Sequence, residues 1–75
     1  MTRERILSDK ELYFLKFLAL PYNDIAERTG YAVGTVKTYQ RRILNRLNAV
    51  NRTHALFKAV KQGIITIEEI VTEWK

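Results

Sequence analysis

The chain has 75 residues, a formal net charge of +5 and no cysteine. This length allows one small domain, and the lack of cysteine excludes disulfides and thiolate zinc ligands. No apolar run reaches the length of a membrane-spanning helix, and the first residues lack the apolar centre of a signal peptide. We therefore expect a soluble, intracellular protein.

The first predicted helix follows a flexible N-terminal stretch, residues 1–7. Ser8 and Glu11 have the spacing of a capping box, in which each side chain bonds the backbone amide of the other residue. The helix is expected to run to about Leu20, because Pro21 stops a helix or starts the next one. Its candidate core residues are Leu12, Phe14, Leu15 and Leu18.

A short second helix and a longer third helix are separated by a tight turn. The second is expected over about 22–29, and Gly30 can adopt the left-handed conformation that ends a helix. The third is expected over about 33–47. This layout predicts a helix-turn-helix over about 22–47, the commonest arrangement for presenting side chains to the major groove of DNA.

Wound at about 100° per residue, the stretch 33–47 separates into two faces. The mostly apolar face holds Val36, Tyr39, Gln40, Ile43, Leu44 and Leu47. The opposite face holds Lys37, Thr38, Arg41, Arg42, Asn45 and Arg46. A solvated surface helix normally mixes acidic and basic residues. A face with basic side chains and no acidic one indicates binding to a polyanion instead.

The charge pattern around this helix supports that interpretation. Residues 28–67 contain eight basic residues and no acidic one. Self-repulsion destabilises a compact domain, so such a block indicates a binding surface. Nucleic acid is the best candidate, because neutralising phosphates releases counterions. An anionic membrane surface is the minor alternative.

Two further helices are expected. Asn48 can end the third helix in the left-handed conformation, and Asn51 can cap a fourth that runs to about Gln62. Thr66 and Glu69 form a second capping box, which predicts an amphipathic C-terminal helix over 66–75. The predicted fold is all-α: a compact four-helix helix-turn-helix domain over 8–65 with this short additional helix.

Four motifs follow one another along most of the chain: Ile25-Ala-Glu-Arg28, Gly34-Thr-Val-Lys-Thr38, Ile43-Leu44 with Arg46-Leu47, and Asn51-Arg-Thr-His-Ala55. Together they resemble the LuxR/GerE-type helix-turn-helix domain of bacterial transcription factors. The resemblance implies sequence-specific binding of double-stranded DNA by a dimer, usually paired through the fourth helix. The positions that match base-contacting positions are Lys37, Thr38 and Arg41. Phosphate contacts are expected from Thr35, Arg42, Arg46 and Arg52.

The chain departs from the family pattern in the link at Pro21-Tyr22, which is short and lacks a glycine. Ala32 also stands where a serine or threonine generally caps the recognition helix. The domain is normally the output end of a longer protein. Met1 and the expected C-terminal helix favour a small stand-alone regulator.

We expect a transcription regulator of the bacterial cytoplasm and nucleoid that forms a weak homodimer. The expected dimer contacts are Leu56, Val60, Ile67, Ile70, Val71 and Trp74. The alternative function is a protein-interaction module that binds RNA polymerase or another regulator. Ser8, His54 and the carboxylates show no triad or paired-acid arrangement, so we expect no enzyme, cofactor, metal or small-molecule ligand.

Overall fold

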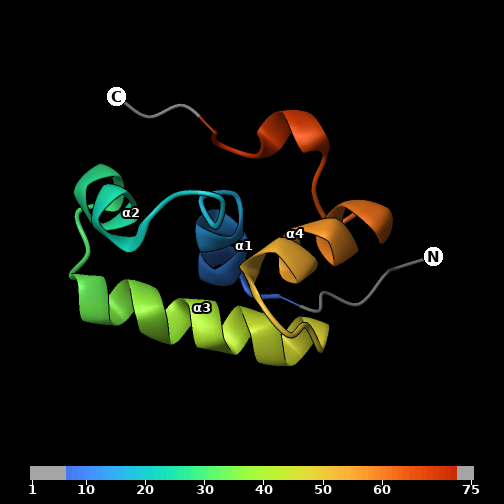
Figure 1. Cartoon of the computed structure of the whole chain (residues 1–75), viewed down its shortest axis with the longest axis horizontal. Coiled ribbons are helices and arrows are strands. Elements are labelled where there is room, and N and C mark those ends of the chain that lie inside the picture. Colours follow the sequence, from blue (N-terminus) through green and yellow to red (C-terminus); the bar gives the residue numbers. More distant parts are fainter. Residues whose placement is uncertain (1–6, 73–75) are drawn as a thin grey trace.

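The computed structural model describes residues 7–72, and no strand occurs among them. The helices are α1 (Asp9–Leu15), α2 (Tyr22–Thr29), α3 (Val33–Leu47), α4 (Arg52–Lys61) and the 3₁₀ helix η1 (Ile67–Glu69). Figure 1 shows α3 along the lower side of the molecule, with α1, α2 and α4 above it. The predicted all-α, four-helix fold is confirmed.

α1 begins as predicted and ends earlier. The Ser8 hydroxyl accepts from the Glu11 amide at 3.2 Å, and Glu11 Oε1 accepts from the Ser8 amide at 2.9 Å. The helix stops at Leu15, and the amides of Phe17, Leu18 and Leu20 then bond carbonyls three residues back. The expectation of a helix to about Leu20 is therefore wrong. A straight helix would spread the buried side chains at 14, 15, 17, 18 and 20 over more than half of its circumference.

α2 and α3 span the residues expected for these two helices, and a tight turn joins them. Gly30 is left-handed with φ 79°, and its amide donates to the Ala26 carbonyl. The Thr29 hydroxyl donates to the Ile25 carbonyl at 2.7 Å and accepts from the Tyr31 amide at 3.3 Å. These bonds close the turn before α3 starts. The cap position of α3, Ala32, makes no side-chain hydrogen bond.

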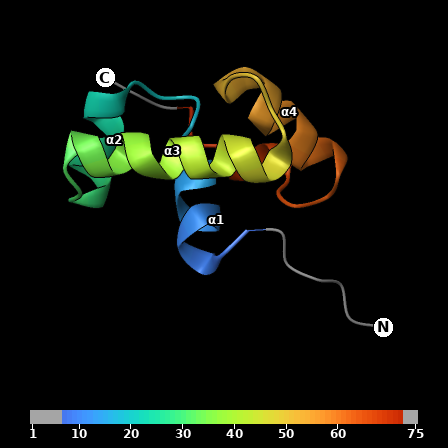
Figure 2. The ribbon, with the colours of Figure 1, turned by 90° about the horizontal axis from the view of Figure 1, so that it is seen from below.

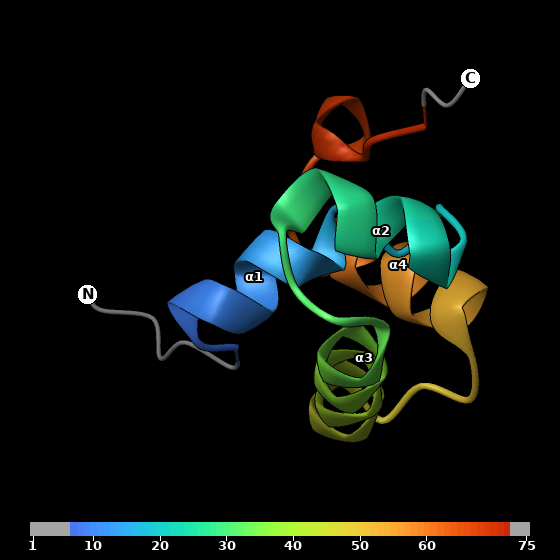
Figure 3. The ribbon, with the colours of Figure 1, turned by 90° about the vertical axis from the view of Figure 1, so that its left-hand side faces the viewer.

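α3 contacts each of α1, α2 and α4. Seen along its axis, it lies below the other three helices (Figure 3). From below, no other ribbon crosses in front of it (Figure 2). The buried apolar core comprises Leu7, Phe14, Leu15, Phe17, Leu18, Leu20, Ile25, Val36, Ile43, Leu47, Ala55, Ala59 and Ile65. The inward positions predicted on α3 agree, with Tyr39, Gln40 and Leu44 half-buried.

The predicted caps around α4 are confirmed. Asn48 is left-handed with φ 56°. Asn51 Oδ1 accepts from the His54 amide at 2.8 Å, at the start of α4. α4 then ends at Lys61, within a residue of the expected Gln62.

The C-terminal segment differs from the expected helix over 66–75. Its capping box forms, with the Thr66 amide donating to Glu69 Oε1 at 2.8 Å, yet it opens only the short η1. The Val71 amide donates to the Lys16 carbonyl at 2.8 Å, so it is not available for a bond within a helix. Lys16 offers that carbonyl because α1 has ended. The predicted contact residue Trp74 lies outside the described residues.

Candidate nucleic-acid interface

The outward side of α3 carries four exposed cations and no acidic side chain. All six side chains predicted to face away from the core are exposed: Lys37, Thr38, Arg41, Arg42, Asn45 and Arg46. We call these six residues the α3 face. α3 contains no acidic residue. Since α1, α2 and α4 pack on its opposite side, this helix presents a basic surface on a fixed support.

The α3 face has a centre and two edges. At about 100° per residue, Lys37 and Arg46 point about 180° apart, and Thr38, Arg41 and Asn45 lie between them. The Thr38 hydroxyl donates to the Gly34 carbonyl at 3.0 Å, which leaves its oxygen able to accept a further bond. A Cβ added at Gly34 would meet no atom within 4 Å, so the surface beside Thr38 is open. Sequence reasoning placed Asn45 on this face without assigning it a contact.

The edge of the α3 face beside α1 is held by polar and aromatic contacts. Arg46 Nε donates to Glu11 Oε2 at 3.0 Å. The Glu11 side chain is 2% exposed, whereas that of Arg46 is 55% exposed. Arg42 lies 5.3 Å from the centre of the Tyr39 ring, which in turn stacks on Phe14 of α1 at 4.8 Å. We call Arg42 and Arg46, with Lys10 of α1, the α1 edge.

Lys10 extends this edge beyond α3. Its Nζ lies 5.3 Å from the centre of the Tyr31 ring. A hydrogen bond to the Tyr31 side chain, helped by the charges of Tyr31 and Tyr39, raises the pKa of Lys10 above its ordinary value. The contact therefore lets Lys10 keep its charge to a higher pH than an unpaired lysine does.

The opposite edge is built around one tyrosine. Lys37 Nζ lies 5.2 Å, and the Arg52 guanidinium carbon 5.1 Å, from the centre of the Tyr22 ring. Arg52 Nη1 also donates to the Leu20 carbonyl at 2.7 Å. We call Tyr22, Lys37 and Arg52 the α2 edge. Arg52 therefore joins α4 to the segment before α2, a role that sequence reasoning did not predict.

The predicted site residues thus fall into groups. Thr38 and Arg41 occupy the centre and Lys37 the α2 edge, while Thr35, Arg42 and Arg46 lie on the side toward α1. Arg52 stands apart from α3, across the Tyr22 ring. Glu11 and Tyr22 were missed. Glu11 was interpreted only as a cap, because no local pattern reveals a partner 35 residues away.

The predicted dimer contacts are mostly covered within the chain. Leu56, Val60, Ile70 and Val71 are half-buried and pack against the core. Ile67 is 68% exposed. Sequence reasoning missed two exposed apolar side chains, Phe57 of α4 at 61% and Val50 at 79%. The spacing of Ala55, Leu56, Ala59 and Val60 along one face of α4 turns Phe57 outward, a consequence that sequence reasoning did not draw.

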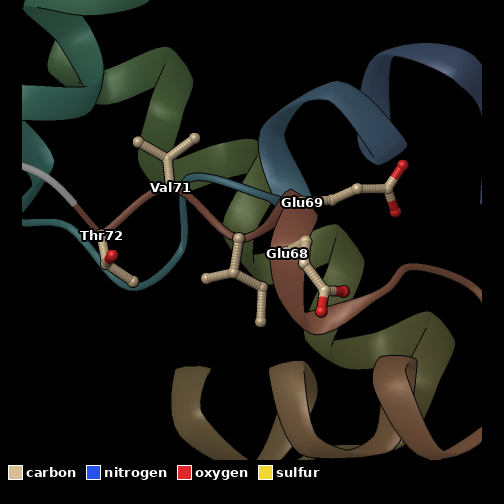
Figure 4. Close-up of a pocket in the computed structure, with 5 residues that line it drawn as sticks. Glu68, Glu69, Val71 and Thr72 are labelled. Carbon is tan, nitrogen blue, oxygen red and sulfur yellow. The ribbon is translucent and has the colours of Figure 1, made fainter.

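The C-terminal segment carries the opposite charge, away from α3. It borders a shallow hollow of about 360 Å³, lined by Glu68, Glu69, Ile70, Val71 and Thr72. Figure 4 shows these five consecutive residues along η1 and the chain after it. In Figure 1 this segment and α3 lie on opposite sides of the molecule. Carboxylates repel phosphate, so this hollow does not extend the basic surface.

His54 Nδ1 accepts from the Val50 amide at 3.1 Å, which makes this histidine a structural element of the loop before α4. Within residues 7–72 no three histidine, cysteine or acidic side chains are grouped to hold a metal ion. No helix in this range is long and apolar enough to cross a membrane.

Comparison with known proteins agrees with this geometry. Residues 5–59 match the profile of bacterial regulatory proteins of the luxR family. The chain is also 41% identical over 58 residues to the uncharacterized transcriptional regulatory protein YxjL of Bacillus subtilis (strain 168). That match covers 75% of this chain and 27% of YxjL, so the chain spans about a quarter of the length of its relative.

Proposed function

The chain belongs to the luxR family of bacterial regulatory proteins, and we propose that it regulates transcription by binding double-stranded DNA at specific sequences. The observation that carries this proposal is the α3 face, where Lys37, Arg41, Arg42 and Arg46 are exposed with no acid among them. A buried core behind the same helix supports it. The proposed activity is binding, with no catalytic step.

We propose that α3 enters the major groove. The groove is about 12 Å wide and admits one α-helix, and fifteen residues of helix are about 22 Å long. Lys37, Thr38 and Arg41 are the proposed base contacts. Arg41 lies at the centre of the face, where an arginine can donate two bonds to the O6 and N7 acceptors of guanine. Asn45, also central, is added to this set.

The phosphate contacts are proposed on both edges of the helix. Thr35, Arg42 and Arg46 lie toward α1, and Arg52 lies on the α2 edge. A helix in the major groove runs between two phosphate backbones, so cations on both edges can contact one backbone each. These contacts position the protein without reading the sequence.

We further propose a weak homodimer that pairs on two half-sites, because one recognition helix covers few base pairs. Leu56 and Val60 of α4 remain in this proposal, and the exposed Phe57 extends it. Ile67 adds an apolar side chain from η1, near the half-buried Ile70 and Val71. Lys58 donates to the Asn48 carbonyl at 3.2 Å, so part of its charge is compensated within the chain.

The dimer is tested by sedimentation velocity with Phe57→Gln and Ile67→Gln, both at exposed positions. We expect Phe57→Gln to shift the population toward monomer, alone and on a two-half-site duplex. Val50→Gln is the matched control, because it removes an exposed apolar side chain outside the helices. Equal dimerisation of Phe57→Gln and the unmodified chain would remove α4 from the proposed contact.

The proposed DNA binding is tested by selecting from random duplexes and then titrating salt. We expect one enriched sequence and a log–log salt slope of about −3 per bound chain, from the phosphate contacts of Arg42, Arg46 and Arg52. Arg41→Ala should lose the preference for that sequence. If no duplex is enriched, the proposal of DNA binding is wrong. The alternative function is then favoured, in which a module of the same fold binds RNA polymerase or another regulator. In the main proposal the protein acts in the cytoplasm, at the nucleoid.

A further inference from the structure

We infer that Glu11 is a positioning residue for DNA binding, whose buried carboxylate holds the Arg46 guanidinium in place for a DNA phosphate. This inference rests on the proposed function. It goes beyond it by assigning a role to an acidic residue of α1 that contacts no DNA itself.

The Glu11 carboxylate is buried and accepts a hydrogen bond on each oxygen. Glu11 uses both oxygens: Oε1 accepts from the Ser8 amide at 2.9 Å and Oε2 from Arg46 Nε at 3.0 Å. The side chain is 2% exposed. The capping box therefore anchors the acceptor to the first turn of α1, and α1 packs directly on α3.

Arg46 keeps most of its hydrogen-bond donors after it bonds Glu11. A guanidinium has five N–H donors, and the bond to Glu11 uses the one on Nε. The two terminal amino groups carry the other four, on a side chain that is 55% exposed. Two such groups match the paired oxygens of a phosphate, an arrangement that a lysine cannot reproduce.

Glu11 has two opposed effects on the contact between Arg46 and a phosphate. Holding a long side chain in one geometry lowers the entropy that it loses on binding, which strengthens the contact. The carboxylate also brings a negative charge toward the phosphate, which weakens it. Because Glu11 is bonded on both oxygens and lies behind the guanidinium, we infer that the positioning effect exceeds the repulsion.

The experiment measures binding of the full chain to a random-sequence duplex by fluorescence anisotropy, at a temperature where circular dichroism shows each variant folded. The variants are Glu11→Gln, Arg46→Lys and the double variant. We expect each single variant to bind about three- to ten-fold more weakly. The double variant should bind no more weakly than Arg46→Lys, because Glu11 acts through Arg46.

Glu68→Gln is the matched control. It changes the net charge by the same amount at an exposed residue of η1, and the ribbon of η1 lies on the far side of the molecule from α3 (Figure 1). We expect Glu68→Gln to bind unchanged or slightly more tightly. Tighter binding of Glu11→Gln would show that repulsion dominates, and additive losses in the double variant would show that Glu11 acts without Arg46. Either result overturns the inference.

These outcomes are distinct from failure of the proposed function, in which the unmodified chain binds no duplex. A second measurement covers the case in which Glu11→Gln does not fold. In the unmodified chain, the Arg46 Nε–H resonance, identified by its loss in Arg46→Lys, should exchange with water more slowly than that of Arg41. It should also shift when a duplex is added. Exchange as fast as that of Arg41 would overturn the inference.

Discussion

On the α1 edge Arg46 donates to a buried carboxylate, whereas on the α2 edge Lys37 and Arg52 lie over the ring of Tyr22. A hydrogen bond between charged groups contributes about 1.5–3 kcal/mol, and an exposed cation such as Lys37 over an aromatic ring about 0.5–1 kcal/mol. The exposure of Arg46 places its bond toward the lower value. Even so, Lys37 is the cation that can leave its resting position more easily.

This difference fits the two proposed tasks. A phosphate contact is the same at every sequence, so a cation held in one place serves it well. A base contact must adapt to the base edges that it meets, which favours a side chain held only by a ring.

Ile43→Ala removes a core side chain that packs on the inner side of α3, behind both edges of the α3 face. Ile43 is fully buried on α3, so the substitution should lower the free energy of unfolding by about 2–5 kcal/mol. Urea denaturation followed by circular dichroism measures it. Asn45→Ala, exposed on the same helix, is the control and should change stability little. A melting temperature unchanged by Ile43→Ala would mean that α3 is rotated from the orientation described.

Arg46→Ala breaks the α1 edge and should affect stability as well as binding. It leaves the buried Glu11 oxygen without its partner, which costs about 1–3 kcal/mol, the lower value applying to an exposed arginine. Lys37→Ala, on the α2 edge, should cost less, about 0.5–1 kcal/mol at most, because it removes only the contact with the Tyr22 ring. The same denaturation assay compares them. Equal losses for the two variants would remove the distinction between the edges.

Arg41→Ala tests the centre between the edges. If Arg41 makes a bidentate base contact, the loss should be about 1–3 kcal/mol on the selected duplex and much less on a random duplex. Anisotropy titrations with both duplexes measure the ratio. Arg42→Ala should weaken binding to both about equally, as loss of a phosphate contact does. A sequence preference that survives Arg41→Ala would contradict the proposal that the centre of the α3 face contacts the bases.

Tyr22→Leu tests the α2 edge through its coupling to Lys37. A double-mutant cycle of Tyr22→Leu and Lys37→Gln should give a coupling free energy of about 0.5–1 kcal/mol in the unbound protein. Chemical denaturation of the four chains measures it. A coupling near zero would mean that the ring does not hold Lys37 in solution.

Tyr31→Phe should produce the smallest effect, at the outer end of the α1 edge. It removes the hydrogen bond that raises the pKa of Lys10 above 10.5, so the pKa of Lys10 should fall toward that value. Because the folded chain has the higher pKa, the contact stabilises the fold fully below pH 10.5 and is lost as pH rises above the folded value. A nuclear magnetic resonance titration of Lys10 in both chains measures the change. An identical pKa in Tyr31→Phe would exclude the bond.

The sequence alone was sufficient for the elements whose signals are local. The limits of α2 and α3, the caps at Ser8 and Asn51, and the left-handed residues Gly30 and Asn48 all agree with the structure. Each depends on residues within one helical turn, where spacing and backbone preference decide the outcome. The outward orientation of the α3 face follows from the same periodicity.

Only the tertiary structure decided the features that join distant parts of the chain. Glu11 meets Arg46 and Arg52 meets the Leu20 carbonyl across more than thirty residues. The bond from Val71 to Lys16 replaces the expected C-terminal α-helix in the described residues. Side chains and carbonyls this far apart come together only when the core packs, and helical periodicity does not specify which of them will meet. The α3 face is therefore a property of local sequence, whereas the way its edges are held depends on packing.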